Sequence, residues 1–245
     1  MHNKTQTLSI VIPAYNEANF IGVLLEKIAE VNLASLGLEK EIIVINDCSA
    51  DQTAEIVRRF DNVILLEHTV NSGKGMAVRT GLDKATGDFL IIQDADLEYD
   101  PEDYIPMLEP LLSNKADVIY GSRYMKHPEA GVIKNLLTGK HPEQSWVAYL
   151  GGQSLSFVSL LFTGRFLSDT VTAYKLFKSP IIKNLALETT GFELDHEISA
   201  KVLSSGHRIM EVPISYLPRT VAEGKKIGLK DWFCAIRTFF RYRNG

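Results

Sequence analysis

The first half of the chain alternates between two hydrophobic patterns. Short runs rich in Val, Ile and Leu are typical of buried strands, and segments with apolar residues three or four positions apart, typical of helices, lie between them. The predicted strands cover residues 8–12, 41–45, 63–66, 89–92 and 117–120, and the predicted helices cover about 17–31, 51–60, 74–86 and 101–113. Because the strands are apolar almost throughout, we expect a mostly parallel, Rossmann-like α/β sheet with helices on both faces.

The second half of the chain is less regular. Residues 126–143 are rich in Lys, His, Pro and Gly, which predicts a loop. Further helices are predicted over 145–163, 180–188, 193–205 and 229–242, and further strands over 169–177 and 207–216. No internal repeat or low-complexity linker interrupts the chain, so we expect a single domain over residues 1–228 followed by a C-terminal helical segment over 229–245.

Charge and cysteine content narrow the class of protein. The net charge of −4 argues against nucleic-acid binding, although residues 225–245 carry six basic residues and one acid, +5, which leaves −9 for the rest. The two cysteines, Cys48 and Cys234, lie far apart without metal-ligand spacing, which fits a reducing, cytoplasmic compartment. The longest uncharged window, residues 145–164, contains several glycines and serines, so we expect no spanning helix and no signal peptide.

Two carboxylates follow the predicted strand over residues 89–92, in the stretch FLIIQDADLEYDPED. Alternate residues of an extended chain point to the same side, so Asp94 and Asp96 are expected to lie together, with Glu98 close by. Like charges repel unless a cation lies between them, and Mg²⁺ or Mn²⁺ prefers such oxygen ligands together with substrate phosphates. The alternative is that these acids only cap the next helix or lie solvated in a loop. It is weakened because Asp100 before Pro101 already supplies a cap and because the pair directly follows a buried strand.

Polar residues also follow the other predicted strands, at the sheet edge where doubly wound folds bind ligands. VIPAYNE ends in Glu17, and VINDCSADQT places Asp47 at a strand end and Asp51 at a helix start. In NSGKGMAVRTGL a glycine-rich turn surrounds Lys74, which either approaches a phosphate or only permits a tight turn. The chain lacks G-x-G-x-x-G after its first strand and lacks G-x-x-x-x-G-K-[ST], which argues against a dinucleotide oxidoreductase and a P-loop NTPase.

Taken together, these segments resemble family 2 glycosyltransferases of the GT-A fold, and within them the dolichyl-phosphate mannosyltransferase-like group of polyprenyl-phosphate glycosyltransferases. The resemblance covers roughly residues 8–230. It rests on SIVIPAYNE, INDCSADQT, NSGKGMAVRTGL and DADLEYDPED, and further on YGSRY, DTVTAYKLF, GFELDHEI and VPISYLPRTVAEGKK, which occur in the order of the family.

The resemblance implies an inverting transfer of a sugar from a GDP- or UDP-linked donor to a polyprenyl phosphate, assisted by Mg²⁺ or Mn²⁺. It also implies roles for individual residues. The donor would contact Pro13, Tyr15, Glu17, Asp47 (through the base), Lys74, Asp94 and Ala95; the metal would contact Asp94, Asp96 and Glu98; and Asp96, Arg123, Arg219 and Lys225 would act on the phosphates.

Four features depart from the pattern of that family. Asn46 replaces an acid, Cys48 replaces a common glycine, and Glu98 stands where the mannosyltransferases often carry Gln. No second arginine lies between Arg123 and Trp146. These departures affect the nucleotide preference, the metal affinity and the acceptor-phosphate contacts.

Two other functions stay open from the residues. An acceptor with a hydroxyl group would need a carboxylate base, for which Glu193 and Asp195 are the candidates. Asn46 also allows a non-catalytic partner subunit that binds nucleotide sugars. The basic residues between 219 and 230 favour a phosphate acceptor, because they would offset the repulsion between two phosphates.

The C-terminal segment DWFCAIRTFFRYRNG has the pattern of a basic amphipathic helix. Its predicted apolar face holds Trp232, Phe233, Ile236, Phe239 and Phe240, flanked by Arg237, Arg241 and Arg243. Such a helix is typical of proteins that lie on an anionic membrane surface, here the cytosolic face. The alternatives are packing on the core, on a membrane-anchoring partner or on a second copy of the chain.

Overall fold

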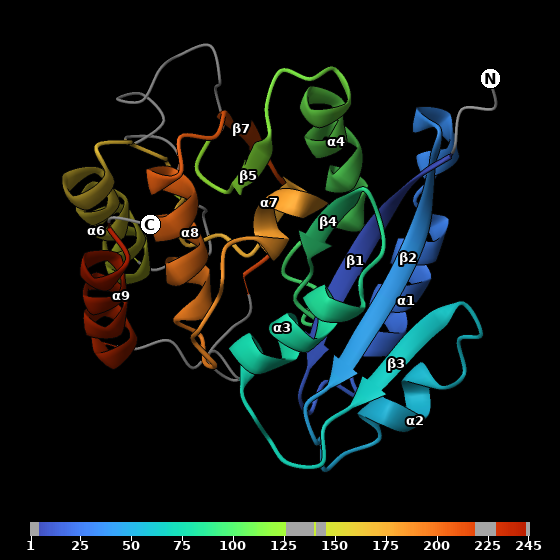
Figure 1. Cartoon of the computed structure of the whole chain (residues 1–245). Coiled ribbons are helices and arrows are strands. Elements are labelled where there is room, and N and C mark those ends of the chain that lie inside the picture. The colour runs from blue at the N-terminus through green and yellow to red at the C-terminus, as the bar shows by residue number, and fades with distance from the viewer. Residues whose placement is uncertain (1–4, 126–139, 141–145, 219–228, 244–245) are drawn as a thin grey trace.

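A sheet of seven strands forms the centre of the computed structural model, which describes residues 5–125, 140, 146–218 and 229–243. In this part of the chain the strand order is β3-β2-β1-β4-β6-β5-β7 (Figure 1). The strands are β1 (Gln6–Ala14), β2 (Leu38–Asn46), β3 (Val63–Glu67), β4 (Phe89–Ile92), β5 (Val118–Ser122), β6 (Lys175–Lys178) and β7 (Ile209–Pro213). All five strands predicted in the first half of the chain are confirmed.

The sheet is parallel except at β6. β1 pairs in parallel with β2 and β4, so that Ile10 lies opposite both Ile42 and Ile91. β3 and β7 add in parallel to β2 and β5, whereas β6 runs antiparallel to its neighbours β4 and β5. The prediction of a mostly parallel α/β sheet is therefore confirmed.

Helices cover both faces of the sheet, which explains the unbroken apolar runs in its strands. One face packs against α1 (Ile21–Glu30), α2 (Thr53–Val57) and α4 (Tyr104–Leu112), and the other packs against α3 (Lys74–Lys84), α7 (Ser179–Lys183) and α8 (Leu194–Ser204). Ile10 and Ile12 of β1 point into the first core and Val11 into the second, and all three are fully buried. Two short 3₁₀ helices, η1 (Leu33–Leu36) and η2 (Pro101–Asp103), complete the first half.

Some predicted element bounds differ from those in the structure. The predicted strand over 169–177 contracts to β6, because Asp169 and Thr172 before it direct their side chains to other polar groups. The predicted helix over 180–188 ends at Lys183, and the helix over 51–60 is only α2. Asp100 caps η2 as predicted, accepting a hydrogen bond from Glu102 N.

Two further helices, α6 (Trp146–Thr163) and α9 (Leu229–Arg241), lie side by side at one edge of the molecule (Figure 1). Trp232 Nε1 of α9 donates to Ser154 Oγ of α6 at 2.8 Å, and Phe239 of α9 is fully buried beside Ala200 of α8. Among the described helices, none combines the length and the apolarity needed to cross a bilayer.

Candidate active site

The turns that leave β1, β2 and β4 share an unusual backbone feature. Each holds one non-glycine residue in the left-handed region, Asn16 at φ 57°, Cys48 at φ 60° and Leu97 at φ 60°. This conformation favours glycine, which gives a physical reason for the glycine that the resembling family commonly has at the position of Cys48. Backbone strain of this kind is concentrated at functional sites.

The first two of these turns are tied to each other. Asn16 N donates to Ser49 Oγ at 2.9 Å, and Ala50 N donates back to Asn16 Oδ1 at 2.8 Å. Glu17 N donates to Thr53 Oγ1 at 2.9 Å. These hydrogen bonds fix the backbone of the turn that carries the predicted donor-binding residues. The side chain of Tyr15 in this turn is exposed.

Asp47 fixes the turn that precedes α3. Its buried carboxylate accepts hydrogen bonds from Ser72 N at 2.9 Å and Gly73 N at 2.8 Å, and its Oδ1 lies 2.7 Å from His68 Nδ1. The predicted contact of Asp47 with a base stays a prediction, and it would have to form beside these bonds.

The glycines around Lys74 allow two backbone segments to touch. A Cβ on Gly73 would lie 2.5 Å from Thr190 O, and one on Gly75 would lie 2.7 Å from Thr189 O. Met76 N donates to Thr190 O at 3.1 Å across the same contact. The structure thus adds a third explanation to the two considered from the sequence: the glycines admit the segment that leads into α8.

Lys74 connects the end of β4 to the start of α8. Its Nζ lies 2.7 Å from Asp94 Oδ1 and 3.0 Å from Asp195 Oδ2. The second oxygen of Asp195 lies 3.3 Å from Nζ of Lys175, a fully buried lysine of β6. The four side chains, from Asp94 through Lys74 and Asp195 to Lys175, form a chain of alternating charge.

The two lysines set the protonation state of Asp195. Burial alone would raise the pKa of this carboxyl, but the ammonium groups of Lys74 and Lys175 outweigh it and hold the pKa of Asp195 well below its usual range. For Lys74 burial works in the opposite direction, and the carboxylates of Asp195 and Asp94 raise its pKa well above the ordinary value. Both groups are therefore charged at neutral pH.

The three predicted metal ligands lie along one turn after β4. Asp94 is partly exposed beside Lys74, Asp96 Oδ1 accepts from Glu98 N at 3.1 Å, and Glu98 Oε2 accepts from Tyr216 OH at 3.1 Å. Within the described ranges no three His, Cys, Asp or Glu side chains converge in a way that could hold a metal ion. Carboxylates of this kind suit Mg²⁺ or Mn²⁺, with the remaining oxygen ligands supplied by a bound diphosphate and water. Ala95 points into the core and is 3% exposed, so its contact with a donor would be through the backbone.

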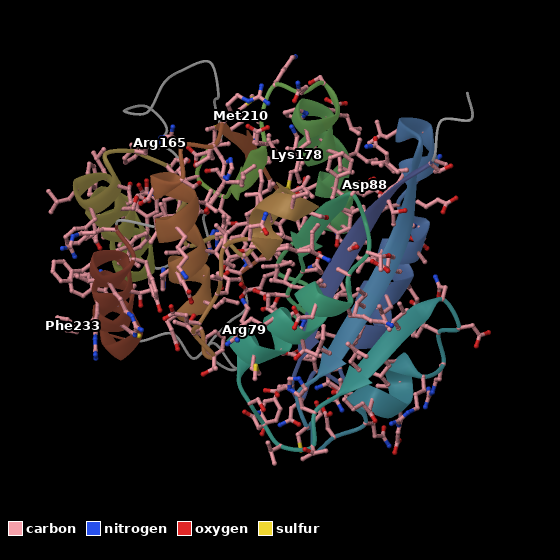
Figure 2. The ribbon with its side chains drawn as sticks, in the orientation of Figure 1. Arg79, Asp88, Arg165, Lys178, Met210 and Phe233 are labelled. Carbon is pink, nitrogen blue, oxygen red and sulfur yellow. The ribbon has the colours of Figure 1, made fainter. Side chains whose placement is uncertain are left out.

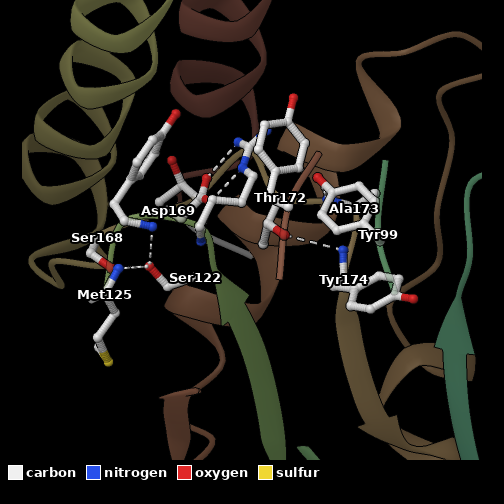
Figure 3. Close-up of polar contacts among 12 residues, drawn as sticks. Tyr99, Ser122, Met125, Ser168, Asp169, Thr172, Ala173 and Tyr174 are labelled. Carbon is white, nitrogen blue, oxygen red and sulfur yellow. Dashed lines mark hydrogen bonds and ion pairs between the residues drawn. The ribbon is translucent and has the colours of Figure 1, made fainter. Parts of the chain in front are cut away.

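Arg123, the predicted phosphate ligand at the end of β5, is held by Asp169. The guanidinium makes a bidentate pair with this fully buried carboxylate (Figure 3), and it also lies 5.0 Å from the ring of Tyr216 and 5.4 Å from that of Tyr124. Burial opposes the charge on Arg123, but Asp169 raises the pKa of the guanidinium well above its ordinary value. The other two predicted phosphate ligands, Arg219 and Lys225, lie outside the described residues.

Sequence reasoning assigned no role to Asp169 or Lys175, and it considered Asp195 only as a base. Asp169 and Lys175 both belong to DTVTAYKLF, which the resemblance singled out as a segment. Their partners are 46 and 20 residues away, so no local pattern could have joined them.

The architecture and these residues agree with a comparison against protein families. The model of glycosyl transferase family 2 matches residues 9–170, more than half of the chain. The chain belongs to this family. It is accordingly a glycosyltransferase, and its fold is GT-A.

Two relatives of this glycosyltransferase carry names that include a lipid phosphate. The dolichol-phosphate mannosyltransferase of Pyrococcus furiosus is 29% identical over 96% of the chain, which spans 63% of that longer protein. The UDP-N-acetylglucosamine–dolichyl-phosphate N-acetylglucosaminyltransferase of Methanococcus voltae is 26% identical, with 91% of this chain and 92% of the relative covered.

Solved structures share the fold of this glycosyltransferase. Mannosyl-3-phosphoglycerate synthase of Rubrobacter xylanophilus aligns with a TM-score of 0.70 and 18% identity, covering 97% of this chain and 72% of the other. Glucosyl-3-phosphoglycerate synthase of Mycobacterium tuberculosis, in complex with Mn²⁺, UDP and glucosyl-3-phosphoglycerate, aligns with a TM-score of 0.66 and 16% identity, covering 97% and 78%.

Proposed function

We propose that this family 2 glycosyltransferase transfers a sugar, with inversion, from a GDP- or UDP-linked donor to a polyprenyl phosphate. Relatives from Pyrococcus furiosus and Methanococcus voltae are named for transfer to dolichyl phosphate. Asp94 and Asp96 would hold Mg²⁺ or Mn²⁺, as the Mn²⁺ and UDP in the Mycobacterium tuberculosis structure suggest. When bound, the cation supplies positive charge that offsets the charge developing on the departing diphosphate.

The two ion pairs of Asp195 are the observation that favours a phosphate acceptor over a hydroxyl acceptor. Each of its carboxylate oxygens is paired with a lysine, at 3.0 and 3.3 Å, and the two lysines keep its pKa low. A carboxylate in this state is a weak base, so it is poorly suited to take a proton from a hydroxyl acceptor. A phosphate acceptor needs no base, because its oxygen is already ionised at neutral pH.

The reaction then requires only orientation and charge. The bond between the anomeric carbon and the donor diphosphate breaks, the nucleoside diphosphate leaves with the electron pair, and an acceptor phosphate oxygen bonds to the opposite face of that carbon. Lys74 and Arg123 are the described cations placed to offset the negative charge of the two phosphate groups. Arg219 and Lys225 are proposed to add to this charge.

Transfer to a hydroxyl group remains the second candidate, with Glu193 as its base. Glu193 Oε1 accepts a hydrogen bond from Gly191 N at 3.2 Å just before α8, and its side chain is partly exposed. Unlike Asp195, this carboxylate makes no lysine ion pair among the described side chains.

The acceptor is tested by incubating the enzyme with Mn²⁺, GDP- or UDP-linked sugars, and either a polyprenyl phosphate or the matching polyprenol. The proposal predicts a glycosylated product with the phosphate only, and a Glu193→Gln variant that keeps at least about half of the wild-type kcat. A product with polyprenol that Glu193→Gln abolishes would establish the hydroxyl route.

The outer face of α6 and α9 supports a position on the membrane surface. The buried side chains of α6 include three polar ones, Gln153, Ser156 and Ser159, beside the apolar Tyr149 and Leu155, whereas Phe157 and Leu161 are exposed. Large apolar side chains on the outside of a helix whose buried face is partly polar indicate an apolar environment outside the molecule.

Next to it, α9 exposes aromatic and basic side chains together. Phe239 is buried, but Phe233 lies on the outer side of the helix (Figure 2), and Phe240 is exposed beside Arg237 and Arg241. The apolar face predicted for the C-terminal segment is therefore divided, with Phe239 packed on the protein and Phe233 and Phe240 exposed. We propose that the exposed residues rest on an anionic bilayer near the lipid acceptor.

Flotation with vesicles tests this position. Wild-type protein should float with vesicles that contain phosphatidylserine, and a Phe157→Ser/Leu161→Ser variant should not. Loss of a dimer in that variant, seen by analytical ultracentrifugation without vesicles, would instead assign the face to a second copy.

A further inference from the structure

Lys74 occupies a position in which it must respond to the cation of the proposed reaction. Its Nζ lies 2.7 Å from Asp94 Oδ1, and Asp94 is one of the two carboxylates proposed to hold that cation. A lysine and a divalent cation on one carboxylate repel each other. The lysine and the cation therefore compete for Asp94, unless the lysine gains another anionic partner.

Asp195 prevents Lys74 from moving away into solvent. The Nζ of Lys74 is shared between Asp94 and Asp195, and its side chain is 13% exposed. Lys175, whose side chain is fully buried, fixes the other oxygen of Asp195 and also donates to Thr172 O. Asp195 is thus fixed to β6 through Lys175. Lys74, which Asp195 holds, reaches Asp94 at the end of β4.

The formal charges of the four residues sum to zero. Asp94 and Asp195 contribute two negative charges, and Lys74 and Lys175 contribute two positive charges. Among the described residues, the negative charge left for a divalent cation by itself comes from neighbours such as Asp96 and Glu98, and the nearby ammonium group of Lys74 opposes its binding. A nucleoside diphosphate reverses this balance, because its phosphates can bind both the cation and Lys74.

We propose that Lys74 is an internal counter-cation that neutralises Asp94 before the substrates bind and turns toward the donor diphosphate when the divalent cation arrives. Asp195 acts as a positioning residue that keeps Lys74 within reach of both partners, and Lys175 anchors Asp195. The consequence is coupled binding: the cation binds well only together with the donor. This inference rests on the proposed function, since it takes the cation and the diphosphate from it.

The backbone on both sides of Lys74 is held in place by neighbouring residues. Asp47 holds the two peptide groups immediately before it, through Ser72 N and Gly73 N. Gly75, immediately after it, packs against the backbone of residues 189–190. Motion at this site is therefore confined to the lysine side chain, whose Nζ also lies 6.0 Å from the exposed ring of Phe192.

The test is the affinity for Mn²⁺, measured from the electron paramagnetic resonance signal of the free ion, with and without UDP or GDP. For wild-type protein we expect one of the nucleotides to tighten Mn²⁺ binding at least about tenfold. In Lys74→Gln we expect Mn²⁺ alone to bind at least about tenfold more tightly than in wild type, with a nucleotide effect below about threefold. Lys84→Gln, which removes the same charge from the exposed far end of α3, serves as the matched control and should behave as wild type.

A second variant tests the positioning role of Asp195 separately from the role of Lys74 as counter-cation. Asp195→Asn frees Lys74 from its second partner and should weaken Mn²⁺ binding in the absence of nucleotide, the opposite sign to Lys74→Gln. In steady-state kinetics with the acceptor, it should raise the KM for the donor several-fold more than it lowers kcat, whereas a base would lower kcat.

The outcomes distinguish this inference from the proposed function. Two results would show that Lys74 is not a counter-cation: wild-type protein that binds Mn²⁺ equally well with and without nucleotide, or Lys74→Gln that binds Mn²⁺ as wild type does. Neither result would contradict the proposed sugar transfer. If Mn²⁺ does not bind even with nucleotide, both proposals are wrong. The comparison within wild-type protein keeps the test decisive even if Lys74→Gln does not fold.

Discussion

Arg123 and Asp169 form a bidentate ion pair in which the carboxylate is fully buried. Arg123 Nε and Nη2 lie 2.6 and 2.8 Å from the two oxygens of Asp169, and Arg123 N adds a third hydrogen bond at 3.1 Å. The pair joins the end of β5 to the segment before β6, so it holds the proposed phosphate ligand in one orientation. Arg123 is thus a fixed cation rather than a mobile one.

Replacing Asp169 by Asn should destabilise the protein strongly. The variant leaves the guanidinium of Arg123 largely buried without its counter-charge, and breaking a buried pair from one side costs roughly 3 kcal/mol. Urea unfolding of Asp169→Asn measures this loss, and the double variant Arg123→Met/Asp169→Leu should recover part of it. A loss below about 0.5 kcal/mol for Asp169→Asn would show that the pair contributes little.

Asp103 gives the stability of the protein a specific pH dependence. Burial raises the pKa of this carboxyl to about 6, with Asp100 and Glu102 adding to the rise and the hydrogen bond from Ser215 N opposing it. The folded protein therefore holds this proton more tightly than the unfolded chain, so the contribution of Asp103 to stability is present below about pH 4 and is lost as the pH rises to about 6.

An Asp103→Asn variant should not show this loss. We expect the unfolding free energy of the variant, relative to wild type, to rise by about 1 kcal/mol between about pH 4.5 and 7.5, after allowance for the partial exposure of the carboxyl. Urea unfolding at the two pH values measures it, with Asp83→Asn as a control for removal of one exposed carboxylate. A constant difference between Asp103→Asn and wild type would be inconsistent with the raised pKa.

Gly75 should not tolerate a side chain. An added Cβ would lie 2.7 Å from Thr189 O and from Thr190 C, which are backbone atoms and cannot turn aside. We expect Gly75→Ala to lower the unfolding free energy by about 2 kcal/mol.

Gly22→Ala is the matched substitution for Gly75→Ala. It adds the same methyl group inside α1, where the nearest atom is Ile56 Cγ2 at 3.3 Å. Because alanine favours the helix by up to about 1 kcal/mol, Gly22→Ala should be neutral or stabilising. Equal melting temperatures for the two variants would refute the close approach at Gly75.

The strands of the first half could be predicted because their pattern is local. Ile10, Val11 and Ile12 face two different cores, so the run is apolar throughout, which is typical of a parallel sheet covered on both faces. The segment before β6 could not be predicted in this way. Asp169 there serves a side chain 46 residues earlier, and that polar contact replaces strand pairing.

The individual residues of the candidate site could be predicted from the sequence, but the contacts between distant residues could not. The strand ends singled out Asp47, Lys74, Asp94 and Asp96, and the structure places all of them along the same edge of the sheet. The pairing of Lys74 with Asp195 spans 121 residues, and only the fold brings them together. The same holds for α6, which exposes Phe157 and Leu161 but buries Gln153, Ser156 and Ser159, since periodicity reveals a helix but not which side faces the core.

The central claim is that Asp94 and Asp96 hold the cation that allows the nucleotide to leave. The most direct measurement is the rate of sugar transfer to polyprenyl phosphate with saturating Mn²⁺ for wild type, Asp94→Ala and Asp96→Ala, with folding checked by circular dichroism. We predict that each variant loses at least about a hundredfold in kcat and that chelation of the metal stops the wild-type enzyme. Turnover at the wild-type rate in either folded variant would contradict the claim.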